Sequence, residues 1–256
     1  MAADTSQPSH AIPVELSGVR KAYGDHVVLR GVDLRVEPGE LVAIVGQSGT
    51  GKSVLLRLII GLEPPDAGRI RVGGMELERY LALPPDEKPF RMAMVFQNAA
   101  LLASLTVAEN VGLRLREHGG HTSQEIAEIT RRSLEQVELA GTEDKLPSEL
   151  SGGMRKRVAI ARALAVDPEL ILYDEPTADL DPILTEEIGG LIRRIRDRRG
   201  TTQIIVTHNL PLAGRIADHI AVLDAGRIAE YVTPRELAAS RHPLTREFLR
   251  AAALEA

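Results

Sequence analysis

The sequence of 256 residues contains no cysteine and no tryptophan, and it has only four tyrosines and three phenylalanines. Without cysteine the chain forms neither disulfides nor cysteine-ligated zinc sites, which is compatible with a reducing compartment. Long apolar runs are also missing, since no uninterrupted stretch approaches the roughly 20 residues that cross a bilayer. No direct membrane span is therefore expected, and any role at a membrane would depend on a partner.

The chain also lacks a strong excess of charge of either sign. Its 31 basic and 36 acidic residues leave a net charge of −5, so no overall basic field attracts nucleic acid or anionic lipid. The densest basic run, Arg193–Arg199, has no aromatic residue interleaved with it, and a solvated helix face explains it better than nucleic-acid contact. The first ten residues have no apolar core like that of a secretion signal.

What the sequence does contain is a phosphate-binding pattern. The apolar run Leu41–Val45 leads into a loop, Gly46–Ser53, that matches Gly-x-x-x-x-Gly-Lys-Ser, and a helix-forming segment follows. The glycines let backbone N–H groups approach oxyanions, and the start of the helix adds its positive dipole end. Lys52 would reach the β- and γ-phosphates, and the Ser53 hydroxyl would ligate Mg²⁺. The strand before and the helix after the loop favour nucleoside triphosphate binding over a simple glycine-rich turn.

The candidate nucleotide-binding residues of this segment are Gly46, Ser48, Gly49, Thr50, Gly51, Lys52, Ser53 and Val54.

A second signal is a short apolar run, 169–175, that ends in two acids, Asp174 and Glu175. Ligands bind at the carboxyl ends of parallel strands, so Asp174 would lie near Mg²⁺ and Glu175 would be free to orient and deprotonate water. Solvation of the strand end could also explain two adjacent acids, but the phosphate-binding loop upstream makes that explanation the weaker one.

Three further signals are weak when taken singly. Tyr23 could stack on a base or could be an ordinary turn residue. Ser151, followed by Gly152 and Gly153, could form a second anion site at a helix start or could be a simple helix cap. His208, just after the expected strand 202–206, could hydrogen-bond a γ-phosphate or could be a satisfied loop residue.

The remaining elements are read from periodicity, caps and turns. Before the phosphate-binding loop, three short alternating runs separated by Gly24-Asp25 and Gly31 predict an antiparallel patch. A capping box at Thr122–Glu125 predicts that a helix begins there. The expected strands are 14–16, 27–29, 32–36, 68–72, 91–96, 169–175, 202–206, 218–223 and 227–231. The expected helices include 52–60 and 155–166, with further helices between 98 and 150 and after Thr233.

Taken in order, these motifs resemble the full motif series of the ABC-type ATPases over roughly residues 14–232. That series comprises an aromatic loop, Walker A, Q-loop, signature, Walker B with a catalytic glutamate, D-loop and switch histidine. The matching residues here are Tyr23, Gly46–Ser53, Gln97, Ser151–Gly153, Asp174, Glu175, Asp181 and His208.

The resemblance implies an α/β fold with a mostly parallel P-loop (RecA-like) sheet core, an N-terminal antiparallel β patch and an inserted α-helical subdomain. The whole chain, 1–256, is expected to be one nucleotide-binding domain. Its helical subdomain would occupy about 98–155 and its C-terminal helical tail about 233–256.

The resemblance also implies roles. Two copies would meet head to tail in an ATP sandwich, so that the Ser151–Gly153 motif of one binds the γ-phosphate held by Lys52 of the other. Tyr23 would stack on adenine and Asp181 would couple the two sites. The expected catalytic residues are Glu175, His208, Gln97 and Lys52, the expected metal ligands are Ser53, Gln97 and Asp174, and the expected cofactors are ATP and Mg²⁺.

Three positions depart from the family's usual pattern. Met154 stands where glutamine is usual and Val54 where threonine is usual, but neither affects a group assigned to phosphate or metal. Asp179 replaces a small residue ahead of the D-loop, and nothing in the sequence explains it.

Three phrases, Gly51–Leu56, Leu150–Arg157 and Leu172–Thr177, together look like the Mla/Mce branch of phospholipid-transport ATPases. That branch implies docking through the region Gln97–Asn110 onto an integral-membrane permease at the cytoplasmic face of the inner membrane, with a lipid-binding Mce-type protein as a further partner. Two alternatives remain: an ABC ATPase for another cargo, such as an amino acid, ion or drug, and a non-transport regulator of the cell-division type. A DNA-repair ATPase is disfavoured because no sustained heptads occur.

Overall fold

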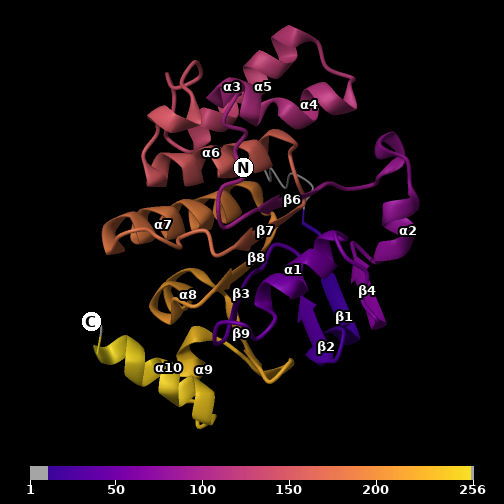
Figure 1. Cartoon of the computed structure of the whole chain (residues 1–256), viewed down its shortest axis with the longest axis vertical. Coiled ribbons are helices and arrows are strands. Elements are labelled where there is room, and N and C mark those ends of the chain that lie inside the picture. Colours follow the sequence, from indigo (N-terminus) through magenta and orange to yellow (C-terminus); the bar gives the residue numbers. More distant parts are fainter. Residues whose placement is uncertain (1–10, 255–256) are drawn as a thin grey trace, which may run out of the picture.

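The computed structural model describes residues 11–254 and contains a six-stranded sheet in the order β10-β9-β3-β8-β7-β6 (Figure 1). All neighbours in this sheet are parallel except β9 and β10, which form an antiparallel hairpin. This confirms the mostly parallel core. Its strands are β3 (Leu41–Val45), β6 (Met92–Val95), β7 (Leu170–Asp174), β8 (Thr202–Thr207), β9 (His219–Asp224) and β10 (Arg227–Val232).

A second sheet, in the order β2-β1-β4-β5, is entirely antiparallel and confirms the predicted N-terminal patch. Its strands are β1 (Val14–Tyr23), β2 (His26–Val36), β4 (Ala67–Val72) and β5 (Met75–Glu76). The predicted break at Gly31 is wrong. Val32 pairs with Val19 and Arg30 with Arg20, so Gly31, at φ +103°, is the extra residue of a bulge inside one long strand.

Helix α1 (Lys52–Ile60) follows β3 and ends at a left-handed Gly61, as predicted. Between β6 and β7 the chain forms the predicted helical insert, which lies above the sheet in Figure 1. The capping box at Thr122 is present, and two short helices, α2 and α8, were not predicted. The bounds are α2 (Leu77–Ala82), a 3₁₀ turn (Pro85–Glu87), α3 (Val107–Val111), α4 (Leu113–His118), α5 (Ser123–Gln136), a 3₁₀ turn (Pro147–Glu149), α6 (Gly152–Ala165), α7 (Pro182–Arg199), α8 (Leu210–Ile216), α9 (Pro234–Ala238) and α10 (Pro243–Leu254).

Helix α6 corrects one expected boundary. The predicted helical run was 155–166, but the helix begins at Gly152, directly after Ser151, whose hydroxyl caps it as the predicted N-cap. Both glycines of the motif therefore lie in the first helical turn, and a subdomain boundary near 155 falls inside α6.

Two apolar cores lie on opposite faces of the six-stranded sheet. Alternation along β3 sends Leu41, Ala43 and Val45 into one core and Val42 and Ile44 into the other. The first core contacts the helices on the left of Figure 1, α6, α7 and α8, and the second contacts α1 and the small sheet on the right. Because β3 is buried on both faces, the loop that follows it emerges from a fixed strand end.

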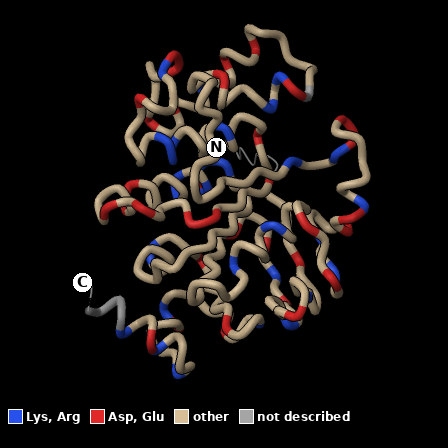
Figure 2. The backbone as a smooth tube through the Cα atoms, in the orientation of Figure 1, with Lys and Arg blue, Asp and Glu red and all other residues tan. Residues whose placement is uncertain are grey.

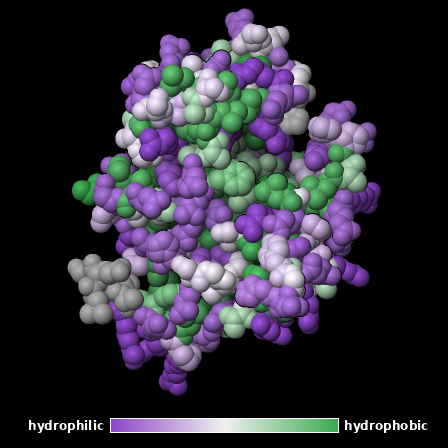
Figure 3. Space-filling view, viewed as in Figure 1, coloured by the Kyte–Doolittle hydropathy of each residue, from purple (hydrophilic) through white to green (hydrophobic). Residues whose placement is uncertain are grey.

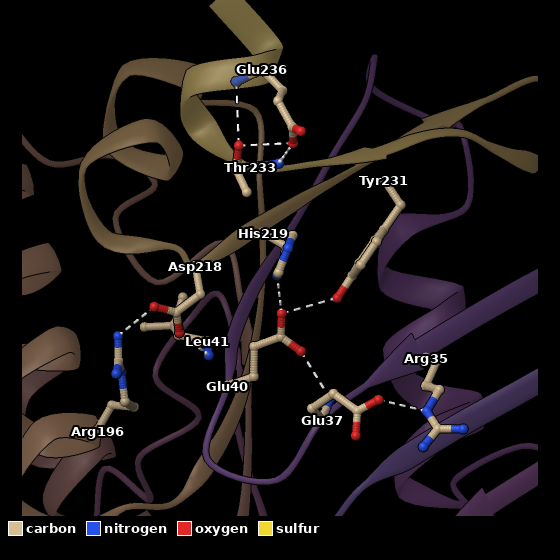
Figure 4. A network of polar contacts seen from close by, with 10 residues as sticks. All are labelled: Arg35, Glu37, Glu40, Leu41, Arg196, Asp218, His219, Tyr231, Thr233 and Glu236. Carbon is tan, nitrogen blue, oxygen red and sulfur yellow. Dashed lines mark hydrogen bonds and ion pairs between the residues drawn. The ribbon is translucent and has the colours of Figure 1, made fainter.

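A polar network holds the opposite, amino end of β3 (Figure 4). The Glu40 carboxylate accepts a hydrogen bond from the Tyr231 hydroxyl at 3.1 Å and also contacts Nδ1 of His219. Burial, together with the charge of Glu40, raises the pKa of Tyr231. Asp218 accepts from the backbone N–H of Leu41 at 2.8 Å. These contacts tie β3 to β9 and β10 and help fix the strand that presents the phosphate-binding loop.

Basic and acidic residues are mixed along the coloured part of the chain in Figure 2, in line with the small net charge. Within residues 11–254, no helix has the combination of length and apolar composition required to cross a bilayer.

Candidate functional site

The loop between β3 and α1 is closed on itself by Lys52. The Lys52 ammonium donates to the carbonyl oxygens of Gly46 and Gln47 at 2.8 and 2.9 Å, and the residue is only 7% exposed. Burial lowers the pKa of Lys52, while the negative charges of Glu175 and Asp174 oppose that shift. A lysine ammonium is thus held at the loop within the field of the two acids that end β7.

Two positions in this loop require glycine. A Cβ on Gly46 would lie 2.5 Å from the Leu223 carbonyl oxygen. Gly51 has φ +99°, and a Cβ there would lie 2.6 Å from Val28 Cγ1. A side chain at either place would push the loop away from β9 or β2, so these glycines allow close packing as well as the turn.

The predicted metal ligands Ser53 and Asp174 meet in space although 121 residues separate them. The Ser53 hydroxyl donates to Asp174 Oδ1 at 2.7 Å. No cluster of three or more His, Cys, Asp or Glu side chains suited to a metal occurs in the described part of the chain. A hydroxyl and one carboxylate nevertheless fit Mg²⁺, which is usually held by one or two protein oxygens together with substrate phosphates and water.

The candidate base Glu175 contacts the candidate switch histidine. Glu175 Oε2 lies 3.0 Å from His208 Nδ1 and accepts from the His208 backbone N–H at 3.3 Å. Glu175 has φ +46°, and its N–H donates to the Val206 carbonyl of the neighbouring strand at 2.9 Å. The left-handed backbone turns the chain sharply at the end of β7, a strained conformation of the kind that clusters at functional sites.

Tyr23 ends β1 rather than lying within the turn. Its ring is 44% exposed, and its hydroxyl donates to Glu63, which also pairs with Arg57 of α1 at 2.7 Å. These hydrogen bonds, with that of Tyr23 the stronger influence, lower the pKa of Glu63. The ring is therefore tethered to the helix of the phosphate-binding loop and remains open to a stacking partner.

The two weaker motifs, Ser151–Gly153 and Asp181, are both helix caps. Ser151 Oγ accepts from the Met154 N–H at 3.2 Å, and Asp181 Oδ1 accepts from the Leu184 N–H at 2.9 Å. The two caps are neighbours, because Cβ atoms on the two glycines would lie 3.7 Å from Leu180 and 3.3 Å from Leu184. Within residues 11–254 no hydrogen bond joins the Ser151 cap to the phosphate-binding loop, so their joint role stays a prediction.

Gln97 lies at the same sheet edge as the acids. It follows β6, whose Val95 pairs with Tyr173, the residue before Asp174. Its side chain makes no hydrogen bond in the described part of the chain, but its backbone carbonyl accepts one from Lys156 of α6. Sequence reasoning missed Lys156, although its spacing to Ile160 and Ala163 puts a lysine on the buried stripe of a predicted helix.

A family model described as ABC transporter matches residues 29–178, more than half of the chain. The chain belongs to the ABC transporter family. This confirms the resemblance drawn from the motifs. The matched range includes the phosphate-binding loop, Gln97, the Ser151 cap and Glu175, and it ends before Asp181 and His208.

Three curated proteins of the ABC transporter family illustrate the similarity. The sulfate/thiosulfate import ATP-binding protein CysA of Synechococcus elongatus is 41% identical over 229 residues, which cover 89% of this chain and 64% of that protein. The L-cystine transport system ATP-binding protein TcyN of Escherichia coli is 41% identical over 242 residues, covering 92% and 96%. Protein TRIGALACTOSYLDIACYLGLYCEROL 3, chloroplastic, of Arabidopsis thaliana is 38% identical over 253 residues, covering 92% and 72%. The chain thus spans less than two thirds of the first of these relatives.

A solved dimer of the ATP-binding cassette MJ0796, in a post-hydrolysis state with ADP and Pi, has the same fold. It superposes with a TM-score of 0.76 at 33% identity and covers 87% of this chain and 99% of its own. The α/β core, antiparallel sheet and helical subdomain are therefore those of an ABC ATPase cassette. None of these comparisons shows the finer prediction, the Mla/Mce branch.

Proposed function

We propose that this chain hydrolyses ATP and powers a membrane transport complex. The observation that carries the proposal is the hydrogen bond between Ser53 and Asp174, because it joins the phosphate-binding loop to the acidic end of β7. That contact supports an assignment in which Glu175, the residue after Asp174, lies beside the bound triphosphate.

In the proposed mechanism Lys52 binds the β- and γ-phosphates. Ser53 and Asp174, with Gln97 at the same edge, would hold Mg²⁺, which when bound neutralises charge on the phosphate oxygens. Glu175 orients the attacking water and takes its proton. His208 holds Glu175 through Nδ1, which leaves Nε2 available for the γ-phosphate.

We further propose a head-to-tail homodimer in which the Ser151 cap of one copy completes the site of the other. Ser151 is exposed and therefore accessible to a second copy of the chain. Closure would exclude water and strengthen the charge interactions at the phosphates. The solved relative with ADP and Pi is described as dimeric, which supports this arrangement.

A permease is the proposed membrane partner, contacted near Gln97–Asn110 from the cytoplasmic face of the inner membrane. Two large apolar side chains in or beside this segment are exposed, Phe96 at 36% and Leu102 at 47%. Apolar side chains also gather near the boundary between the helical insert and the core on the face in Figure 3.

The relatives favour a small solute as cargo over phospholipid. The names of two of them specify sulfate or thiosulfate and L-cystine. The lipid alternative keeps one specific support, because the Arabidopsis relative bears the name of a galactolipid. A lipid-binding Mce-type partner is expected only under the lipid alternative. The alternative without transport is a regulator of the cell-division type.

Two measurements test the proposal. The purified chain should hydrolyse ATP in the presence of Mg²⁺. If neither the chain alone nor the chain with its copurified membrane partner hydrolyses ATP, the proposal is refuted. The proteins that copurify from solubilised membranes then assign the cargo class. A permease with a solute-binding protein supports import of a small solute, and one with a lipid-binding protein supports the lipid alternative. If deletion disturbs division and no permease copurifies, the transport role is wrong.

A further inference from the structure

The segment directly after Gln97 has an unusual backbone. Ala99 and Ala100 are consecutive and both left-handed, with φ +59° and +46°. This conformation is unfavourable for any residue with a Cβ, and two in succession need support from their surroundings. Ala99 is also buried, at 3% exposure.

That support comes from two cationic side chains on α6. The guanidinium of Arg162 donates to the Ala100 carbonyl at 2.6 Å and to the Ala99 carbonyl at 2.7 Å. The ammonium of Lys156 donates to the Gln97 carbonyl. Three of four consecutive carbonyl oxygens are therefore bound by positive charges from one helix, and charge-assisted bonds are stronger than neutral ones.

Lys156 is buried and Arg162 is partly buried. Burial lowers the pKa of Arg162 and of Lys156, and no ion pair involves either residue within 11–254. For Lys156 the negative charges of Asp179 and then Glu175 oppose the shift. The unexplained Asp179 thus supplies a negative charge near a buried lysine, and its own φ of +64° is one that aspartate adopts more readily than most residues.

We propose that Lys156 and Arg162 are positioning residues that clamp Gln97–Ala100 onto the helix beginning at the Ser151 cap. The clamp makes the backbone at Gln97 and the cap parts of one rigid unit. A movement of the cap toward a partner's nucleotide would then carry Gln97 with it. This inference rests on the proposed ATPase function, because only in that function does the position of Gln97 affect the nucleotide site.

The experiment compares Arg162→Met and Lys156→Met, which remove charge and donors but keep an unbranched chain. Arg162→Lys serves as the conservative variant, because it keeps the charge and can reach one carbonyl. The matched control is Arg193→Met, which removes a guanidinium hydrogen bond of 2.8 Å to the Arg215 carbonyl. Arg193 lies on α7, a different helix from Lys156 and Arg162, and is remote from Gln97 in the sequence.

We expect each Met variant to lower kcat by about tenfold or more, since each loses at least one charge-assisted hydrogen bond, with KM for ATP within about twofold. Arg162→Lys should recover an intermediate kcat, and the control should match the wild type. An unchanged kcat in both Met variants, or a loss that Arg162→Lys fails to relieve at all, would overturn the clamp as a positioning device.

Hydrogen exchange tests the clamp without any turnover. The amides of Ala99 and Ala100 should exchange at least tenfold faster in the Met variants of the nucleotide-free protein, while those of β7 keep their wild-type rates. Unchanged exchange at 99 and 100 would refute the clamp. A wild-type chain without ATPase activity would instead refute the proposed function. The exchange data would still test whether Lys156 and Arg162 hold the backbone of Gln97–Ala100.

Discussion

Replacing Lys52 by methionine should change stability and nucleotide affinity in opposite directions. In the free protein the buried ammonium is held by two carbonyl oxygens at 2.8 and 2.9 Å, and burial is the largest influence on its pKa, which is lowered. The charged form is therefore less favourable in the folded state than in the unfolded one. Methionine fills similar space without that charge, so Lys52→Met should unfold at a denaturant concentration equal to or above that of the wild type.

Binding should suffer because the same charge is the proposed contact to the β- and γ-phosphates. Two charge-assisted hydrogen bonds are worth about 1.5–3 kcal/mol each. Their loss weakens ATP binding by about two to four orders of magnitude. Titration with a fluorescent nucleotide measures this. Lys145→Met, which removes an exposed lysine of the helical insert, provides the control and should leave binding and stability unchanged.

The stability difference should also depend on pH with a definite sign. A lysine whose folded-state pKa is lowered binds fewer protons in the folded state, so the wild type gains stability as pH rises from that lowered pKa to the ordinary value of 10.5. Lys52→Met has no such titration, so its advantage should shrink across this window. Wild-type affinity for ATP in Lys52→Met, or a stability advantage that grows with pH, would contradict the assignment of Lys52.

Three other changes test the rest of the site. Glu175→Gln should bind ATP but stall before cleavage, so that a dimer accumulates on size exclusion, and wild-type turnover would show that Glu175 is not the base. Tyr23→Phe loses the hydrogen bond to Glu63 but keeps the ring, so ATP affinity should stay within about twofold of the wild type. Tyr23→Ala removes the stacking surface and should lower ATP affinity about tenfold. Equal affinities in the two variants would exclude stacking. Ser151→Ala should cost about 1 kcal/mol of stability in chemical denaturation through the lost cap. Mixed with Lys52→Met, it should restore at most one working site per dimer, and two restored sites would exclude a shared interface.

Local signals were the part of the structure that the sequence predicted well. The phosphate-binding loop, the cap at Ser151 and the capping box at Thr122 depend on residues within a few positions of one another, so spacing is enough to identify them. That Ser53 and Asp174 lie close together was also expected, because the carboxyl ends of parallel strands share one edge of a sheet.

Features set by distant partners were not predictable. Gly31 can break a strand or form a bulge, and only the pairing with β1 decides for the bulge. Helices α2 and α8 have six and seven residues, too few to show a clear apolar period. The bond from Lys156 to Gln97 joins residues 59 positions apart, and no local pattern indicates which carbonyl a buried lysine reaches.

Ser151 can be a helix cap and part of an anion site at the same time. A helix start leaves four N–H groups without partners inside the helix. The Ser151 hydroxyl accepts from only one of them, that of Met154. The N–H groups of Gly152 and Gly153 have no acceptor within residues 11–254. A cap that fixes the helix start while leaving two donors free is suited to receive an anion from outside the chain, and the absence of side chains on those two residues lets the anion approach.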